Sequence, residues 1–214
     1  MYEKEKQALI DCAHEMQRYG LVVLSGGNVS MRMPCGNFLV TPSAMSYDTM
    51  TTEDIVLVDQ EGNVVEGVRR PSSDIKAILY IFNHMAKVNV VLHTHQPYAT
   101  AVGLVCDVLP VNLVTVIDEV HAAVKVAPFT PSSDEGMGVS TVQYAGDALA
   151  VLLKHHGAMI YGDSIDQALS AAVYLELACK TYLLALSTGR PIPVLSPEEI
   201  AAEGEERGYY GQPK

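Results

Sequence analysis

Two histidines separated by one residue follow an apolar segment in the middle of the chain, and this feature constrains the fold more than any other. Residues 88–92 predict a buried strand, and His93-Thr94-His95 begins where that strand ends. Side chains alternate between the two faces of a strand, so both imidazoles emerge on the same face. A third histidine, His156, follows another apolar run at residues 148–153. Three neutral imidazoles with an open fourth position are the ligand set of many catalytic zinc ions.

The alternative to a metal site is that the histidine pair has only a structural role. The chain has 7 histidines, and a pair with this spacing taken alone is more often structural than metal-binding. The third histidine and an acidic residue, Asp74, shift the balance toward a metal site.

Composition bounds the class of protein. At 214 residues and 49% hydrophobic, the chain suits one well-buried domain spanning residues 1–214 and is short for two. Charged residues make up only 18%, which indicates extra apolar surface that an oligomer would bury. The net charge of −11 argues against nucleic acid or an anionic membrane as a partner.

The spacing of the cysteines and the N-terminal residues indicate in which cellular compartment the protein is expected. The 4 cysteines show no C-x-x-C spacing, so neither a disulfide framework nor a thiolate zinc site is indicated. The first residues are polar and charged, and no apolar run has the length of about 18 residues that a membrane span needs. We therefore expect a cytoplasmic protein without a signal peptide.

Helical and strand patterns interleave along the whole chain, which predicts an α/β fold. The predicted helices cover most of residues 1–20, then 75–86, 97–104, 139–153, 166–187 and a final segment from 196 to about 211. The end of the 139–153 pattern merges with a strand approaching His156. The predicted strands are 21–24, 38–40, 55–58, 64–65, 88–92, 124–126 and 159–162, with a hairpin turn at 60–63.

Three loops carry glycine or hydroxyl residues suited to an anion. Gly27 and Asn28 belong to Ser-Gly-Gly-Asn, whose glycines allow the backbone to approach a phosphate. Ser43 lies in Thr-Pro-Ser, and Ser72 and Ser73 precede a predicted helix, where an anion is favoured. Taken singly, each loop is better explained by turn formation or helix capping.

Acidic and tyrosine residues supply candidates for proton transfer. Asp74 either stabilises the start of a helix or serves as a metal-proximal ligand or proton carrier. Asp118 is by itself most simply a surface charge, and Tyr209-Tyr210 is an unusual pair for a polar tail. The other histidines are interpreted as bystanders or packing residues: His14, His84, His121 and His155.

Six motifs occur in an order that resembles the class II aldolase/adducin-head family. They are Ser-Gly-Gly-Asn-Val-Ser (25–30), Thr-Pro-Ser (41–43), Pro-Ser-Ser-Asp (71–74), His-Thr-His (93–95), His-His-Gly (155–157) and Tyr-Gly-Gln (210–212). The resemblance covers essentially the whole chain. The family includes L-fuculose-1-phosphate aldolase and L-ribulose-5-phosphate 4-epimerase.

The resemblance implies a fold and a site. It implies a single α/β domain with a central, largely antiparallel sheet flanked by helices, assembled as a homotetramer with active sites between subunits. It further implies that Tyr210 donates a proton in a neighbouring subunit's site. By motif, the zinc ligands are His93, His95 and His156, and the phosphate pocket is Gly27, Asn28, Ser43, Ser72 and Ser73. Three histidines with an open position also suit manganese or cobalt.

Several positions depart from the family pattern, and they bear on which of the family's two reactions this chain would catalyse. Asp74 stands where the aldolases have glutamate and the epimerase has aspartate, and Asp118 matches an aspartate that the epimerase uses. Val114 stands where the fuculose-type aldolase has tyrosine. In contrast, Thr41 replaces the phosphate-binding lysine of the epimerase, and Ala44 replaces a glycine that both enzymes carry.

The length of the segment between the metal-ligand motifs favours the aldolase. His95 and His156 are separated by the shorter, aldolase-like spacing, whereas the epimerase has an insertion. We therefore predict a zinc-dependent aldolase of the L-fuculose-1-phosphate type, cleaving a ketose phosphate by retro-aldol chemistry through a metal-bound enediolate. The 4-epimerase, which begins with the same bond cleavage, is a close alternative. A related dehydratase or decarboxylase and a non-catalytic adducin-like module are less favoured, and the sequence leaves the sugar and its stereochemistry open.

Overall fold

A computed structural model describes residues 1–206 of the chain. Within these residues, a sheet of nine strands runs in the order β4-β3-β2-β1-β5-β9-β8-β7-β6. The pairs are antiparallel except β7–β8. The strands are β1 Asn28–Arg32, β2 Phe38–Val40, β3 Val56–Val58, β4 Val64–Glu66, β5 Val90–Thr94, β6 Val108–Leu109, β7 Val124–Ala127, β8 Ala150–Leu153 and β9 Gly157–Gly162. The predicted α/β fold with a largely antiparallel sheet is confirmed.

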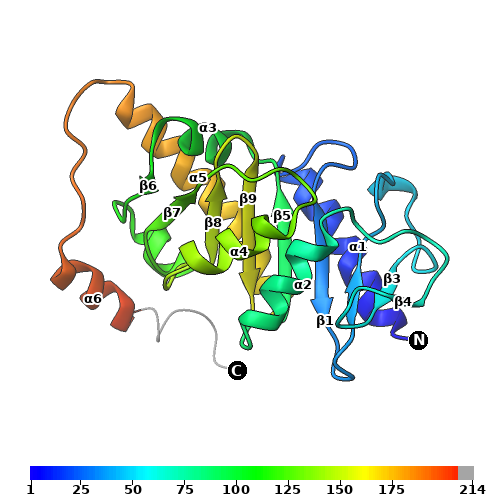
Figure 1. Ribbon diagram of the computed structural model, residues 1–214. Helices are drawn as coiled ribbons and strands as arrows, with labels where there is room; N and C mark the ends of the chain where they lie inside the picture. The colour runs from blue at the N-terminus through cyan, green and yellow to red at the C-terminus, as the bar shows by residue number, and fades with distance from the viewer. Residues whose placement is uncertain (207–214) are drawn as a thin grey trace.

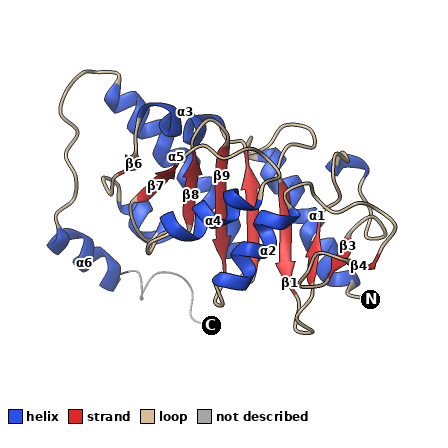
Figure 2. Cartoon of the chain, viewed as in Figure 1, coloured by secondary structure: helices blue, strands red, loops and turns tan. Residues whose placement is uncertain are grey.

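Helices cover both faces of this sheet (Figures 1 and 2). They are α1 Glu3–Arg18, α2 Ile75–His84, α3 Pro97–Val105, α4 Glu135–Tyr144, α5 Ile165–Leu186 and α6 Pro197–Glu206, with short turns η1 Tyr47–Thr49 and η2 Val116–Val120. α1, α3 and α5 pack on the face that includes Leu92 and Ile160. α2 and α4 pack on the face that includes Val91 and Met159. Since side chains alternate along β5, His93 points to the α2/α4 face together with Val91.

Helix α5 is a core helix. Its buried residues recur at helical spacing and are Ala168, Ala171, Ala172, Leu175, Ala178 and Cys179. By length and composition alone it is also apolar enough to cross a membrane, a test that core helices of this kind pass. Its Glu176 carboxylate accepts hydrogen bonds from the N–H groups of Tyr98 and Ala99, both 2.9 Å long. These bonds satisfy free donors at the start of α3, directly after the histidine strand.

The predicted strand at residues 21–24 is wrong. The chain turns there, because Leu24 has a φ of 55° and Gly26 N–H bonds to the Val23 carbonyl at 3.0 Å. Leu21 and Val22 are buried in the core but do not form a strand. Their one backbone bond to a neighbouring strand segment runs from His95 N–H to the Leu21 carbonyl at 3.1 Å. The strand forms instead at β1, a few residues later.

The predicted helix at residues 139–153 is correct only in its first part, and its end is the strand with which the prediction said it merges. α4 begins earlier, with the Asp134 side chain accepting a hydrogen bond from Gly136 N–H, and it ends at Tyr144. Gly146 has a φ of 55°, which breaks the helix, and residues 150–153 become β8. The other predicted elements are present within a few residues, including the hairpin turn, where Asp59 accepts from the N–H groups of Glu61 and Asn63. The predicted end of the final helix at Tyr209-Tyr210-Gly211 lies outside the described residues.

The close packing of β9 against β5 gives a testable prediction. A Cβ added at Gly157 would lie 2.1 Å from the Thr94 carbonyl oxygen and 3.0 Å from His95 Cδ2. We expect Gly157→Ala to lower the free energy of unfolding by about 2 kcal/mol or more, measured by urea denaturation. Gly204→Ala on α6 is the matched control, because it meets nothing within 4 Å and alanine is the better helix former. Equal stability of the two variants would contradict this packing.

Candidate functional site

The fold brings three histidines to one point. His93 lies near the end of β5, His95 lies just beyond it, and His156 lies in the turn between β8 and β9. The Nε2 atom of His93 is 3.0 Å from that of His95 and 3.2 Å from that of His156. One ligand atom from each ring lies within 4.8 Å of the others. Residues predicted to be metal ligands from widely separated motifs therefore form one cluster.

Local backbone geometry places His156 in this cluster. β5 and β9 pair so that Thr94 lies opposite Ala158, which brings the residue before β9 beside the end of β5. The β8–β9 turn is tight: His155 has a φ of 61°, and His156 N–H bonds to the Leu153 carbonyl at 3.1 Å. Gly157 allows the two strands to approach closely at this position.

The ring of His93 is held in the tautomer that can bind a metal through Nε2. His93 Nδ1–H donates to the Ala158 carbonyl at 3.0 Å, which leaves the lone pair of Nε2 directed at the cluster. Burial, together with the charges of His95 and His156, lowers the pKa of His93 to about 3. Burial also lowers the pKa of His95 and of His156, although the Asp74 carboxylate acts on both in the opposite direction. Neutral imidazoles at neutral pH are what metal binding requires.

The spacing of the nitrogens fits a divalent metal ion. Zinc–nitrogen bonds of about 2.0–2.1 Å in a tetrahedral arrangement place ligand nitrogens roughly 3.3 Å apart. The two Nε2 separations of 3.0 and 3.2 Å are close to this value.

A pocket of about 270 Å³ opens onto the three histidines. Gly27, Ser43, Ser72 and Ser73, which the sequence predicted to bind phosphate, line it together with Asp74. The remaining lining residues are Ser25, Gly26, Pro42, Ala44, Ser132 and Ser133. The fold thus gathers the predicted phosphate loops beside the predicted metal ligands, and their binding roles remain predictions.

Asn28 is placed differently from the other predicted phosphate residues. It is buried, and it does not line the pocket. Its Nδ2 donates to Asp74 Oδ2 at 2.9 Å. Within the described chain its Oδ1 atom is buried without a hydrogen-bond partner. This geometry makes Asn28 a support for the Asp74 carboxylate.

Asp74 precedes α2 without capping it through its side chain. The residue is 8% exposed and lines the pocket, and its charge acts on both His95 and His156. A buried carboxylate beside neutral imidazoles is suited to accept or hold a proton. Asp74 makes no capping bond to α2, and its role as a metal-proximal ligand or proton carrier stays a prediction.

Asp118 and Tyr210 are the two remaining predicted catalytic residues. Asp118 is in the π-helical turn η2 and does not line this pocket. Its Oδ1 atom is buried and has no hydrogen-bond partner among the described residues. Tyr210 lies outside the described residues.

Sequence reasoning missed Ser132 and Ser133, which line the pocket. A signal for them was present. Residues 131–134 repeat the tetrapeptide Pro-Ser-Ser-Asp of residues 71–74. Both copies precede a helix of the same sheet face, α2 and α4.

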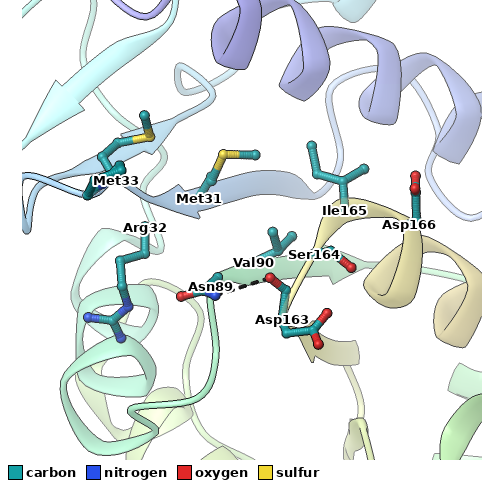
Figure 3. A pocket seen from close by; sticks show the side chains of 10 residues that line it. Met31, Arg32, Met33, Asn89, Val90, Asp163, Ser164, Ile165 and Asp166 are labelled. Atoms are coloured by element: carbon teal, nitrogen blue, oxygen red, sulfur yellow. Dashed lines mark hydrogen bonds between the residues drawn. The ribbon is translucent and has the colours of Figure 1, made fainter. Parts of the chain in front are cut away.

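A larger cavity of about 450 Å³ lies at the other end of β1 and β5 (Figure 3). Met31, Val90 and Ile165 contribute apolar side chains, and the Asn89 amide donates to the Asp163 carbonyl at 3.1 Å. The Arg32 guanidinium at its edge is already bonded to the carbonyls of Phe82 and Val88. The smaller pocket has the convergent polar groups and is therefore the candidate active site.

Comparison with known proteins gives consistent matches. The profile of the family described as "Class II Aldolase and Adducin N-terminal domain" matches residues 7–183. An L-fuculose phosphate aldolase of Escherichia coli K12 is 31% identical over 98% of this chain and 97% of its own length. A 5-deoxy-D-ribulose 1-phosphate aldolase of Bacillus thuringiensis is 27% identical over 99% of both chains. A solved structure of an L-fuculose 1-phosphate aldolase superposes with a TM-score of 0.88 at 28% identity, covering 94% of each chain.

Adjacent histidines provide a matched test of the metal centre. We expect His156→Asn to weaken zinc binding on the order of 100-fold or more, since losing even a residue that orients a ligand costs 10–100-fold. His155→Asn is the control, because His155 is exposed and asparagine tolerates its φ of 61°. Competition with a chelator measures the affinity. Equal affinities for the two variants would remove His156 from the metal centre.

Proposed function

The chain belongs to the class II aldolase and adducin N-terminal domain family, and on this premise we propose that it is a metal-dependent aldolase that cleaves a phosphorylated ketose by retro-aldol chemistry. The observation that carries the proposal is one pocket lined by three converging histidines, a buried carboxylate and three hydroxyl or glycine loops. The full-length similarity to sugar-phosphate aldolases supports it. Zinc is the proposed metal, and manganese or cobalt suits the same ligands.

The phosphate is proposed to bind at Gly27, Ser43 and Ser73. Gly27 has a φ of 99°, and a Cβ there would lie 2.4 Å from the His93 carbonyl oxygen, so only glycine lets this loop approach the histidine strand. Ser43 and Ser73 are exposed and line the pocket, so their hydroxyl groups are accessible to a ligand. They can therefore donate to phosphate oxygens. Ser72 Oγ accepts a bond from the backbone N–H of Asp74 at 3.3 Å, a contact within the same loop.

Asp74 is proposed to move the proton in the bond-breaking step. A bound metal supplies positive charge that stabilises negative charge developing on substrate oxygens. Asp74 would take the proton of the substrate hydroxyl on the carbon that leaves as an aldehyde. That C–O bond becomes a carbonyl, and the electron pair of the broken C–C bond stays on the fragment that carries the phosphate. The bond from Asn28 Nδ2, 2.9 Å long, holds the carboxylate in position for this transfer.

Protonation of the phosphate-bearing fragment is assigned to Tyr210 of a neighbouring subunit. This assignment comes from the family pattern and includes the homotetramer with sites between subunits. Apolar side chains that are exposed in one chain support an assembly, among them Leu104, Val105 and Leu184. A cytoplasmic setting is part of the proposal, supported by the four free cysteines.

The epimerase remains the second candidate. Asp118 favours it, because a buried carboxylate oxygen without a partner is available for a role that the single chain does not show. A dehydratase or decarboxylase of the same family would use the same metal ligands. An adducin-like module would have no need of a converging ligand set, so the three-histidine cluster argues against it.

Phosphorus NMR on the zinc-loaded protein separates these functions. We expect L-fuculose 1-phosphate to give dihydroxyacetone phosphate, because the substrate binds through its phosphate and is cleaved beside the metal. A second pentulose phosphate formed from L-ribulose 5-phosphate would instead establish the epimerase. Absence of turnover of either sugar by the metal-loaded protein would reject both.

The two Pro-Ser-Ser-Asp copies provide a matched test of Asp74. We expect Asp74→Asn to lower kcat about 10²–10⁴-fold, the contribution typical of a positioned acid or base, with metal content unchanged. Asp134→Asn is the control, since its side chain bonds to Gly136 N–H at 2.7 Å and asparagine caps a helix equally well. Steady-state kinetics and metal analysis of both variants decide the matter. Retained turnover in Asp74→Asn would exclude it from proton transfer.

A further inference from the structure

The buried hydroxyl of Tyr47 links two of the loops that line the candidate site. Tyr47 begins η1, which follows the Thr-Pro-Ser loop, and its hydroxyl donates to the Gly27 carbonyl at 2.7 Å. Gly27 lies in the Ser-Gly-Gly-Asn loop. Both loops line the pocket of the three histidines, and both are proposed above to bind phosphate. One hydrogen bond therefore joins two separate parts of that phosphate site.

The side chain and the backbone of Tyr47 are both held in place. The residue is 2% exposed, packs in the same core cluster as α1 and α5, and does not line the pocket. His14 Nε2–H donates to the Tyr47 carbonyl at 2.9 Å, which ties η1 to α1. The Tyr47 hydroxyl therefore has a fixed position from which it can hold a neighbouring loop.

This hydroxyl remains a hydrogen-bond donor at physiological pH. Burial raises the pKa of Tyr47 well above its ordinary value, and the nearby Cys12 and Asp74 act in the same direction, whereas a hydrogen bond with Thr41 opposes them. A neutral tyrosine hydroxyl has one hydrogen to donate. The Gly27 carbonyl accepts it.

The peptide group at Gly27 is the part of the loop that needs this support. Gly27 has a φ of 99°, and a Cβ there would lie 2.4 Å from the His93 carbonyl oxygen. Glycine is required, but it also lets the adjoining peptide groups rotate at little cost. The bond to the buried Tyr47 directs the Gly27 carbonyl toward the core. A carbonyl oxygen turned into the pocket would instead repel an anion there.

The Thr-Pro-Ser loop is bonded in turn to the Pro-Ser-Ser-Asp loop. Ser43 N–H donates to the Arg70 carbonyl at 3.0 Å. Ser72 N–H donates to the Thr41 carbonyl at 3.1 Å. Since Tyr47 joins the glycine loop to this pair, the three loops proposed to hold the phosphate form one hydrogen-bonded unit.

Resting on the proposed binding of a phosphorylated ketose, we propose that Tyr47 is a positioning residue that sets the affinity of the pocket for phosphate. Its hydroxyl holds the Gly27 carbonyl away from the anion and fastens the glycine loop to the two serine loops. Tyr47 does not line the pocket, so it acts through the loops and leaves proton transfer at Asp74 unchanged. Its loss is therefore expected to affect KM and to spare kcat.

Tyr47→Phe removes the hydroxyl and keeps the ring. We expect the dissociation constant of inorganic phosphate, measured by calorimetric titration of the full chain, to rise about tenfold, the effect of one hydrogen bond on an equilibrium constant. In the zinc-loaded protein, KM for L-fuculose 1-phosphate should rise by a similar factor with kcat unchanged, as expected for lost uniform binding. Zinc affinity, measured by competition with a chelator, should stay the same.

Tyr161→Phe is the matched control. Tyr161 is also 2% exposed, and its hydroxyl is buried without a hydrogen-bond partner among the described residues. Its removal should leave the phosphate constant, KM and kcat unchanged. A purely structural role of Tyr47 would lower stability in urea without changing the phosphate constant of the folded protein. If Tyr47→Phe is only marginally folded, the shift of its thermal midpoint with phosphate concentration gives the same constant.

Three results overturn the inference. Equal phosphate binding by wild type and Tyr47→Phe rejects the positioning role and leaves the phosphate pocket standing. A parallel loss of zinc affinity in Tyr47→Phe means that the substitution damages the whole site, which also rejects a role specific to phosphate. Absence of phosphate binding by the wild type rejects the phosphate pocket of the proposed function, and this inference with it.

Discussion

The antiparallel pairing of β5 with β9 is the constraint on which the site depends. Its register sets Thr94 opposite Ala158 and so places His156 beside His93 and His95. The same pairing provides the Ala158 carbonyl that accepts from His93 Nδ1 at 3.0 Å and fixes the tautomer of that ring. Gly157 makes the approach possible, because a larger residue would collide with Thr94. The positions of the three histidines, the protonation of the His93 ring and the packing of the two strands therefore all depend on the same register. A shift of the register by one residue would place the histidines on different faces of the sheet.

The two copies of Pro-Ser-Ser-Asp show how surroundings assign roles to identical residues. Asp134 caps its own helix through Gly136 N–H, as the local sequence favours. Asp74 occupies the same position before α2 but makes no such bond, because Asn28 from the neighbouring β1 holds its carboxylate beside the histidines. One aspartate bonds to its own helix, and the other lines the candidate site. Tertiary contacts, absent from any local motif, make this distinction.

Sequence patterns predicted the features that depend on local periodicity or on single motifs. The strand before His93 and His95, the long helix that became α5, and the class of fold were all correct. The errors occurred at apolar segments whose residue pattern is compatible with more than one type of secondary structure. Leu21 and Val22 are buried without a strand, and residues 150–153 continue a helical pattern yet pair with β7. Gly146, whose positive φ ends α4, was the local signal that separates those two segments. The repeated tetrapeptide marks Ser132 as similar to Ser72, but its position beside the site depends on how α4 packs on α2, which no local pattern encodes.

The topology of the sheet also affects the order in which its strands can pair during folding. β1 to β4 are consecutive along the chain and pair in chain order, and even the longest connection among them, from Val40 to Val56, joins positions much closer in sequence than the centre of the sheet does. The centre of the sheet is different, since the contact between His93 and Ala158 joins positions 65 residues apart. Closing a loop of this length has an entropic cost that must be met before the contact stabilises anything, which makes such pairing a slow step in folding. The three histidines converge only after that step. In a chain that is incompletely folded or newly synthesised, the three histidines are therefore still apart when they meet metal ions in the cell. Tight metal binding would then appear only when folding is complete.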